Sequence, residues 1–343
     1  MSPIQIALER VISGIPLTQQ EAMDAMGVIM DGEASNAQIG ALLAGLRVRG
    51  ETVDEIAGFA KAMRARAVKV PSHRDNLIDT CGTGGDVIKT FNISTGAAIV
   101  SAACGVAVAK HGNRAVTSKA GSADVLEALG VAMDLTSEQV GYCVDTIGIG
   151  FLFARNLHPA MRHAASVRAE LGFRTVFNVL GPLTNPAGAQ RQVLGVYHTS
   201  LCEQLAHVMD SLGCIHALVV HGEAGIDEIS TFGRTFLAEL VGGIVTTGYL
   251  VPGDVGIVES SPEEVSAGEN AEENAEILQR VFSGSDRART DLIAINAGAG
   301  LLVSGKTSTL VEGVRMAQDA IKSGAALSKL QELIELTNRL SRG

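Results

Sequence analysis

A run of small residues at positions 79–95, DTCGTGGDVIKTFNIST, combines a glycine-rich turn with a lysine and several hydroxyl and amide side chains. Three glycines stand within four positions, at 82, 84 and 85, shortly after the apolar pair Leu77 and Ile78. Glycine has no Cβ, so backbone N–H groups in such a turn can approach an anion closely. The Asn-Ile-Ser-Thr that follows is typical of a helix start, which also binds anions. The pattern predicts a cradle for a phosphate group.

Residues 87–123 form a long stretch that contains no Asp or Glu, whereas 37 acids in 343 residues would place about four there. The same stretch holds Lys89, Lys110, His111, Arg114 and Lys119. Positive charge on loops beside a glycine-rich turn attracts anions. The alternative is an ordinary solvated basic face, because short charge patterns are common by chance.

Adjacent carboxylates, Asp227 and Glu228, lie in HGEAGIDEIS at positions 221–230, after an apolar run. Mg²⁺ typically takes one or two carboxylates together with phosphate oxygens and water. An isolated Asp-Glu pair is usually surface charge, so the metal hypothesis depends on this loop lying near the glycine-rich turn. A third segment, residues 154–168, carries Arg155, Arg162 and Arg168 without an acid. One of these arginines could bind the carboxylate of a second substrate through its planar guanidinium, and the others would then face solvent.

Two better-known glycine motifs do not fit. A dinucleotide-binding G-x-G-x-x-G would need glycine at 87, where the chain has Val87, and an acid inside the acid-free stretch. GLLVSGKT, residues 300–307, matches the P-loop pattern letter for letter. However, the preceding segment is predicted to be helical and the loop would hold three large apolar residues, so an NTPase is disfavoured.

The elements that must position these residues fall into two parts. TQQE, SNAQ and TVDE, which begin at Thr18, Ser35 and Thr52, are capping-box patterns before apolar residues at helical spacing. With residues 4–12 they predict about four helices and a small helical domain over 1–72, which would be a scaffold or a dimer contact.

From residue 73 to 343 the pattern changes to short apolar runs that alternate with helical segments. Candidate strands are 77–81, 105–109, 147–153, 192–197 and 216–222, with a helix at 158–172, a turn-rich loop at 178–186 and helices from 308 to 340. This predicts an α/β domain with a mostly parallel sheet flanked by helices. Ligands of such sheets bind at the carboxyl ends of the strands, where GTGGD, KHGNR and GEAGIDE would share one edge.

The whole-chain composition excludes several classes of protein. Hydrophobic residues make up 46% of the 343 residues and aromatic residues 3%, with 39 glycines, which favours a packed α/β protein. A net charge of −10 argues against nucleic-acid binding. The five widely spaced cysteines are typical of a reducing compartment. The uncharged stretch 90–109 is better explained as a buried helix and strand than as a membrane span. We expect a cytoplasmic protein without a membrane partner.

GTGGD, KTFNIST, KHGNRAVTSKAGSADVLEALG, NVLGPLTNP and DE, in this order over nearly the whole chain, resemble the anthranilate phosphoribosyltransferase family. This resemblance implies a nucleoside phosphorylase-like fold and a homodimer through the helical domains, with the segment at about 158–190 packed against the helical domain. It also implies transfer of the phosphoribosyl group of 5-phosphoribosyl 1-pyrophosphate to the amine of anthranilate, in tryptophan biosynthesis, with two Mg²⁺ ions per subunit. An anthranilate synthase amidotransferase is a candidate partner.

The resemblance also assigns residues to substrates. The positions that would bind phosphoribosyl pyrophosphate are Gly82, Gly85, Asp86, Thr90, Asn92, Ile93, Ser94, Thr95, Lys110, His111, Gly112, Asn113, Arg114, Ala115, Val116, Thr117, Ser118 and Ser122. Those that would contact anthranilate are Gly82, Asn113 and Arg168, and those that would ligate Mg²⁺ are Ser94, Asp227 and Glu228. No general acid or base is assigned, although His111 is a candidate proton acceptor.

Two alternatives remain at this point. A pyrimidine nucleoside phosphorylase has a related fold but uses inorganic phosphate and needs no paired acids for metal. A non-catalytic homologue that binds nucleic acid would require a basic surface and loss of the acids, which this chain does not show.

Overall fold

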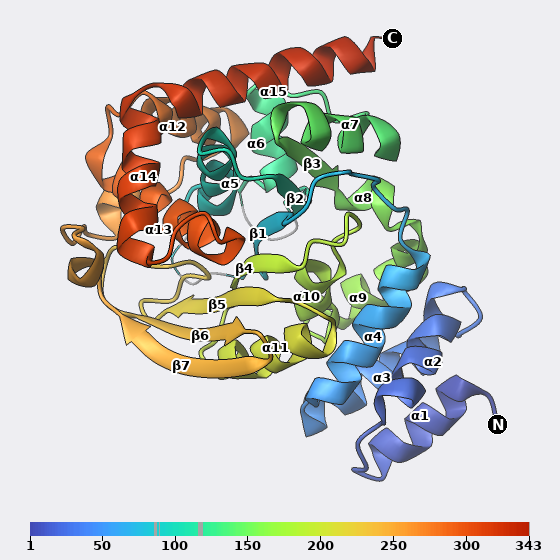
Figure 1. Ribbon diagram of the computed structural model, residues 1–343. Coiled ribbons are helices and arrows are strands. Elements are labelled where there is room, and N and C mark those ends of the chain that lie inside the picture. The colour runs from blue at the N-terminus through green and yellow to red at the C-terminus, as the bar shows by residue number, and fades with distance from the viewer. Residues whose placement is uncertain (86–87, 89, 116–118, 343) are drawn as a thin grey trace.

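The computed structural model describes residues 1–85, 88, 90–115 and 119–342. A bundle of four helices at the N-terminus lies beside a larger α/β part built on one twisted sheet (Figure 1). The helices of the bundle are α1 (Pro3–Ile12), α2 (Gln19–Met30), α3 (Asn36–Arg49) and α4 (Val53–Arg66). The three capping boxes are confirmed, because Thr18, Ser35 and Thr52 are the N-caps of α2, α3 and α4 and each accepts the backbone N–H three residues later.

The sheet has the order β3-β2-β1-β4-β5-β6-β7. Its strands are β1 (Ile78–Gly82), β2 (Val108–Gly112), β3 (Ile149–Phe153), β4 (Arg191–Gly195), β5 (His216–Gly222), β6 (Thr235–Val241) and β7 (Ile244–Leu250). The first five strands pair in parallel, whereas β6 and β7 pair antiparallel. The mostly parallel sheet is therefore confirmed, and the β6–β7 hairpin is an addition that the sequence analysis missed.

Successive residues of the central strands point to opposite faces and build two separate cores. Val193 and Leu218 belong to the core beneath α5, α12, α13 and α14, whereas Leu194 and Val219 belong to the core shared with α11 and the bundle. The helices of the first face, with their neighbours along the edge, are α5 (Ile93–Ala103), α6 (Ser122–Ala128), α7 (Ser137–Ile147), α12 (Ala271–Phe282), α13 (Arg287–Ser304), α14 (Leu310–Lys322) and α15 (Ala325–Ser341).

The second face is covered by the segment between β3 and β5. Its elements are α8 (Ala154–Leu157), the 3₁₀ turn η1 (Pro159–Met161), α9 (Arg162–Leu171), α10 (Phe177–Leu180), η2 (Gly181–Thr184) and α11 (Ser200–Ser211). In Figure 1, α9–α11 lie between the sheet and the blue bundle, and α9 packs against α2 and α3. The connection after β7 contains the short turns η3 (Pro252–Val255) and η4 (Glu263–Val265).

Two segments differ locally from the prediction. The strand expected at 105–109 is β2 at 108–112, so Lys110 and His111 lie on the strand itself and not on the loop after it. The turn-rich loop expected at 178–186 contains the helical turns α10 and η2.

The P-loop look-alike at 300–307 is no loop. Gly300 lies inside α13, and Gly305 ends that helix with a φ of 79°. A Cβ at Gly300 would lie 2.8 Å from Ser101 Oγ of α5. This glycine therefore allows two helices to pack closely, and the segment lacks the loop between strand and helix that a P-loop requires.

No helix in the described part of the chain is long and apolar enough to span a membrane.

Candidate active site

The sheet order places a topological switch point between β1 and β4. From β1 the chain moves outward to β2 and β3, and then returns to β4 on the other side of β1. Ligands of open α/β sheets bind in the crevice at the carboxyl ends of the strands at such a point. Here these ends are Gly82 of β1 and Gly195 of β4, which are register partners.

The acidic loop after β5 lies directly on these two strand ends. A Cβ at Gly82 would overlap the Asp227 carboxylate, and a Cβ at Gly195 would overlap the Asp227 carbonyl oxygen. The backbone N–H of Gly84 donates a hydrogen bond to Asp227 Oδ2 over 2.7 Å. The predicted convergence of the glycine-rich turn and the acidic loop on one edge is therefore confirmed.

The N–H groups of Thr83 and Gly84 donate to Gly195 O and Asp227 Oδ2, so within the described part of the glycine-rich turn an anion would meet the N–H of Gly85, and beyond it the N-terminus of α5. Gly84 and Gly85 have φ values of 69° and 93°, which only glycine adopts readily. Helix α5 begins at Ile93, whose N–H donates to Phe91 O over 2.8 Å, and the N–H groups of Ser94 and Thr95 have no acceptor within the helix. Thr80 of β1 donates its hydroxyl to Ser94 O over 3.0 Å, which fixes the start of this helix against the strand.

The carboxylates of Asp227 and Glu228 fit a divalent ion that a substrate completes. They are 6% and 8% exposed. In the described residues no group of three His, Cys, Asp or Glu side chains is arranged to hold a metal alone. Two carboxylates and a hydroxyl such as that of Ser94 suit Mg²⁺, which is commonly bound by one or two carboxylates plus substrate phosphates.

Two cations of the predicted basic stretch at 87–123 are paired with acids. Arg114 forms ion pairs with Asp124 and Glu127 of α6, and Lys119 pairs with Glu269 before α12. Lys110 is buried, and its Nζ donates to the His111 carbonyl over 2.9 Å. Lys89 of the same stretch lies outside the described residues.

Arg168 differs from the other arginines of its segment. Arg155 and Arg162 are exposed, whereas Arg168 is partly buried and its guanidinium lies 5.1 Å from the centre of the Phe177 ring. Burial lowers the pKa of Arg168, and among the described residues it has no ion-pair partner within 4.0 Å. A desolvated guanidinium of this kind favours an anionic ligand.

The remaining predicted residues lie around the same edge. Asn113 is exposed at the end of β2, and its carbonyl accepts the Ser122 hydroxyl over 3.2 Å. The Asn92 amide donates to Ala120 O over 3.3 Å, which links the start of α5 to the segment before α6. The positions outside the described residues are Asp86, Val116, Thr117 and Ser118.

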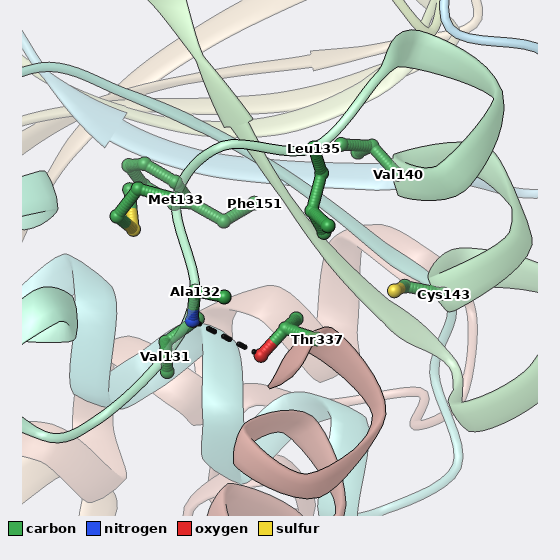
Figure 2. Close-up of a pocket in the computed structure, with 8 residues that line it drawn as sticks. All are labelled: Val131, Ala132, Met133, Leu135, Val140, Cys143, Phe151 and Thr337. Atoms are coloured by element: carbon green, nitrogen blue, oxygen red, sulfur yellow. Dashed lines mark hydrogen bonds between the residues drawn. The ribbon is translucent and has the colours of Figure 1, made fainter. Parts of the chain in front are cut away.

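A hollow elsewhere in the molecule has a different character. Figure 2 shows it between the connection from α6 to α7, strand β3 and α15, with Ala132 N–H donating to the Thr337 hydroxyl over 3.2 Å. All eight lining residues are uncharged, and burial raises the pKa of the Cys143 thiol to about 11. This hollow therefore lacks the groups that an anion or a metal would need.

Comparison with known proteins agrees with this geometry. Residues 5–67 match the family model for the helical bundle domain of a glycosyl transferase family, and residues 74–327 match that for its α/β domain. The anthranilate phosphoribosyltransferase of Symbiobacterium thermophilum is 52% identical over 97% of both chains. The crystal structure of the Thermus thermophilus enzyme is 46% identical with a TM-score of 0.92, covering 97% of this chain and 99% of that one. The chain belongs to the anthranilate phosphoribosyltransferase family.

The family includes a yeast enzyme whose structures contain relevant ligands. The Saccharomyces cerevisiae anthranilate phosphoribosyltransferase in complex with phosphoribosyl pyrophosphate and Mg is 30% identical, with a TM-score of 0.89 over 98% of both chains. The same yeast enzyme has also been solved with 4-fluoroanthranilate.

A buried polar network beneath the site of this family member was missed by the sequence analysis. Asp79 is fully buried and accepts hydrogen bonds from His111 N–H over 3.1 Å and from the Asn185 amide over 2.8 Å. Asn185 also donates to Ala109 O over 2.8 Å. Strands β1 and β2 pair only at Ile78 and Val108, so this network connects them where they separate. Asp79 stands in the glycine-rich motif, but nothing in its spacing indicates a role below the site.

His158 is a second residue that the sequence analysis left without a role. Its ring lies 5.1 Å from that of His111, and the Nε2 atoms of both rings are buried without a hydrogen-bond partner in the described structure. Burial is the main cause that lowers the pKa of His111 to about 3 and that of His158 to about 4. Both rings are therefore neutral at pH 7, which lowers the cost of leaving their two Nε2 atoms buried without a partner among the described residues.

The two histidines should make the enzyme less stable as the pH falls from 7 to 5. Their folded-state pKa values lie below the unfolded value of 6.5, so the unfolded chain binds more protons in this range. Each should lower the free energy of unfolding by roughly 2 kcal/mol at pH 5. Urea unfolding at both pH values checks this, with His111→Gln and His158→Gln expected to reduce the difference and the exposed His207→Gln to leave it unchanged. Equal differences in all four proteins would contradict the burial of neutral rings.

Proposed function

We propose that the edge formed by the ends of β1, β2, β4 and β5 is the active site for the reaction after which the family is named. The enzyme transfers the phosphoribosyl group of phosphoribosyl pyrophosphate to the amine of anthranilate, giving N-(5-phosphoribosyl)anthranilate and pyrophosphate in tryptophan biosynthesis. It is a pentosyltransferase. The observation that carries the proposal is the hydrogen bond from Gly84 to Asp227, because it joins an anion-binding turn to a carboxylate pair at the switch point.

Phosphoribosyl pyrophosphate would lie between the glycine-rich turn and the start of α5. Gly82 and Gly85 border it, and the first turn of α5, with Thr90 nearby, offers N–H and hydroxyl donors to its phosphates. The residues from Lys110 to Ser118, with Ser122, complete this side, and Asp86 belongs to the same set. Lys110 serves here through the positive charge that it places below the site.

Anthranilate would lie between Gly82, Asn113 and Arg168. Its carboxylate matches the guanidinium of Arg168, which can donate two parallel hydrogen bonds.

Mg²⁺ would be held by Ser94, Asp227 and Glu228, and we propose two ions per subunit. When bound, Mg²⁺ neutralises the negative charge that develops on pyrophosphate as it departs. Asp227 is already oriented for this role by Gly84, whose N–H holds one carboxylate oxygen. Ser94 lies in the first turn of α5, and the hydrogen bond from Thr80 fixes that turn to β1.

The chain's own groups act mainly by electrostatics and positioning. Cleavage at the ribose C1 passes through a transition state with oxocarbenium character, as in glycoside hydrolysis. Backbone donors aimed at the departing pyrophosphate are worth about 2.7–4 kcal/mol each in comparable sites. The aromatic amine is nucleophilic when neutral, and a His111 with a pKa of about 3 is a weak base. We therefore assign no general base.

The rival activity, a pyrimidine nucleoside phosphorylase, predicts a different product. With anthranilate, phosphoribosyl pyrophosphate and Mg²⁺, the purified enzyme should release one pyrophosphate for each anthranilate whose fluorescence is lost. Phosphorolysis of a nucleoside by inorganic phosphate, without this pyrophosphate release, would overturn the proposed function.

Arg168→Ala should raise KM for anthranilate by roughly 10- to 100-fold, the value of a charge-assisted hydrogen bond, and change KM for phosphoribosyl pyrophosphate little. Steady-state kinetics with each substrate varied in turn checks this. Arg162→Ala, an exposed arginine on the same helix, is the matched control and should behave as wild type. An equal rise in both KM values would remove Arg168 from the anthranilate site.

The double variant Asp227→Asn with Glu228→Gln should lose activity by on the order of 10²-fold or more and no longer respond to Mg²⁺. Titration of activity with Mg²⁺ measures both effects. Glu223→Gln is the control, because Glu223 lies in the same connection but pairs with Arg234. A double variant with full activity would show that these carboxylates are not the ligands.

We further propose that residues 1–72 and 73–343 are the two domains and that the enzyme is a homodimer joined through the helical domains. Ile12 at the end of α1 and Val48 in α3 are 76% and 89% exposed, and α1 contacts α3. Large apolar side chains exposed on two contacting helices support an interface on this domain.

Light scattering should show a wild-type dimer and a monomer for Ile12→Asp with Val48→Asp. Val258→Asp, at a 68% exposed position outside the bundle, should remain dimeric. A double variant that stays dimeric would place the interface elsewhere.

Two further proposals concern the surroundings of the enzyme. We place it in the cytoplasm, since all five cysteines are unpaired, as a reducing compartment keeps them. An anthranilate synthase amidotransferase is the partner that we propose on chemical grounds, because its enzyme would supply the acceptor; co-purification from cell extract would test the complex. With a net charge of −10, we propose no nucleic-acid partner.

A further inference from the structure

Helix α13 contains one buried amide side chain in an otherwise apolar segment. Asn296 is 1% exposed. Its Oδ1 accepts the Ile229 N–H over 2.9 Å, and its Nδ2 donates to Ile229 O over 2.9 Å and to Leu292 O over 2.9 Å. A single side chain thus binds both backbone groups of Ile229, which follows Glu228 directly.

These bonds fix the backbone on which the carboxylate pair stands. The N–H of Ile229 belongs to the peptide group that also contains the Glu228 carbonyl, so its hydrogen bond orients that peptide plane. The C=O of Ile229 belongs to the next peptide group. With two consecutive peptide planes held by one side chain, the chain direction at Glu228 is determined from the interior, and Gly84 separately holds the Asp227 carboxylate.

Helix α13 is itself located by close contacts with α5. A Cβ on Gly96 of α5 would overlap the Ile293 side chain of α13, and a Cβ on Gly300 would lie 2.8 Å from Ser101 Oγ. The Ser101 hydroxyl donates to Ala297 O over 3.4 Å. Because α5 also carries Ser94 in its first turn, α13 relates the position of Ser94 to that of the acidic loop.

We infer that Asn296 is a positioning residue for the divalent cation, holding the Asp227–Glu228 backbone at a set distance from Ser94 without touching the ion. This inference rests on the metal ligands of the proposed function. Residues that orient metal ligands in this way commonly affect metal affinity by 10- to 100-fold when they are replaced.

The competing interpretation is an ordinary buried asparagine that only stabilises the fold. Asn274 of α12 offers a matched comparison, since it is 2% exposed and also binds backbone in both directions. Its Oδ1 accepts Gly268 N–H over 3.1 Å, and its Nδ2 donates to Asn270 O over 2.7 Å. A purely structural role should make replacement of either asparagine equally costly and should leave metal affinity alone.

The test uses the full-length enzyme with Mn²⁺ as a spectroscopic substitute for Mg²⁺, in the presence of phosphoribosyl pyrophosphate and without anthranilate. Electron paramagnetic resonance gives the Kd for Mn²⁺ directly, without turnover. Asn296→Ala should weaken Mn²⁺ by on the order of tenfold or more, whereas Asn274→Ala should stay within about twofold of wild type. KM for anthranilate should change little in Asn296→Ala, because Arg168 lies on a separate helix.

The double variant Asp227→Asn with Glu228→Gln should lose Mn²⁺ binding. If it does, and folded Asn296→Ala still binds Mn²⁺ with the wild-type Kd, the inference is overturned while the proposed ligands stand. Tight Mn²⁺ binding by that double variant would instead reject the ligands themselves, and the inference with them. The two failures are therefore distinguishable.

Folding of the variants does not limit the test. In the metal-free wild-type enzyme, the Ile229 amide proton should already exchange slowly with solvent, because Asn296 holds it before any ion binds. Rapid exchange of this proton without metal would contradict the inference.

Discussion

The close approach of Asp227 to the ends of two strands, through its carboxylate to β1 and through its backbone to β4, is the constraint on which the rest of the site depends. It is allowed because Gly82 and Gly195, which are paired in the sheet, lack the Cβ atoms that would occupy the same space. The chain can then place the carboxylate of Asp227 within hydrogen-bonding distance of Gly84. The rigid sheet thereby positions a loop that carries the functional side chains, as is usual in α/β enzymes.

Close packing between helices fixes the position of α5, which carries the other part of the site. Gly96 and Gly300 let α5 and α13 approach one another, and Gly298 does the same for α13 and α14, since a Cβ there would lie 2.6 Å from Val314 N. Interiors packed at this density have little freedom to shift. The glycines of the P-loop look-alike therefore have a structural reason of their own, which shows how a motif can match without its function.

The parts of the site that could be predicted from the sequence are those with a local cause. Helix caps at Thr18 and Thr52 follow from side-chain hydrogen bonds over three residues, and the shared edge follows from parallel strands ending together. The polar core could not be predicted, because Asp79 meets its partner Asn185 only after folding has brought together positions 106 residues apart. His158 was missed for the same reason, as its environment rather than its neighbours in sequence lowers its pKa. The β6–β7 hairpin did carry a local signal in the sequence, which was overlooked. The adjacent glycines Gly242 and Gly243 form its turn, and both have positive φ.

The pairing of the cations changes how this acidic protein must attract its anionic substrate. Arg114 and Lys119 are bound to acids, so these two side chains add little net positive potential at the edge. Exposed ion pairs are weak, however, typically below about 1 kcal/mol, so a phosphate could exchange for the acids at small cost. The fixed attraction must then come mainly from the α5 N-terminus, whose partial charges cost no side-chain entropy. Such donors supply orientation but only fractional charge. A substrate with several negative charges therefore needs a divalent ion to balance it, which is why the carboxylate pair and the anion-binding turn must occupy the same edge of the sheet.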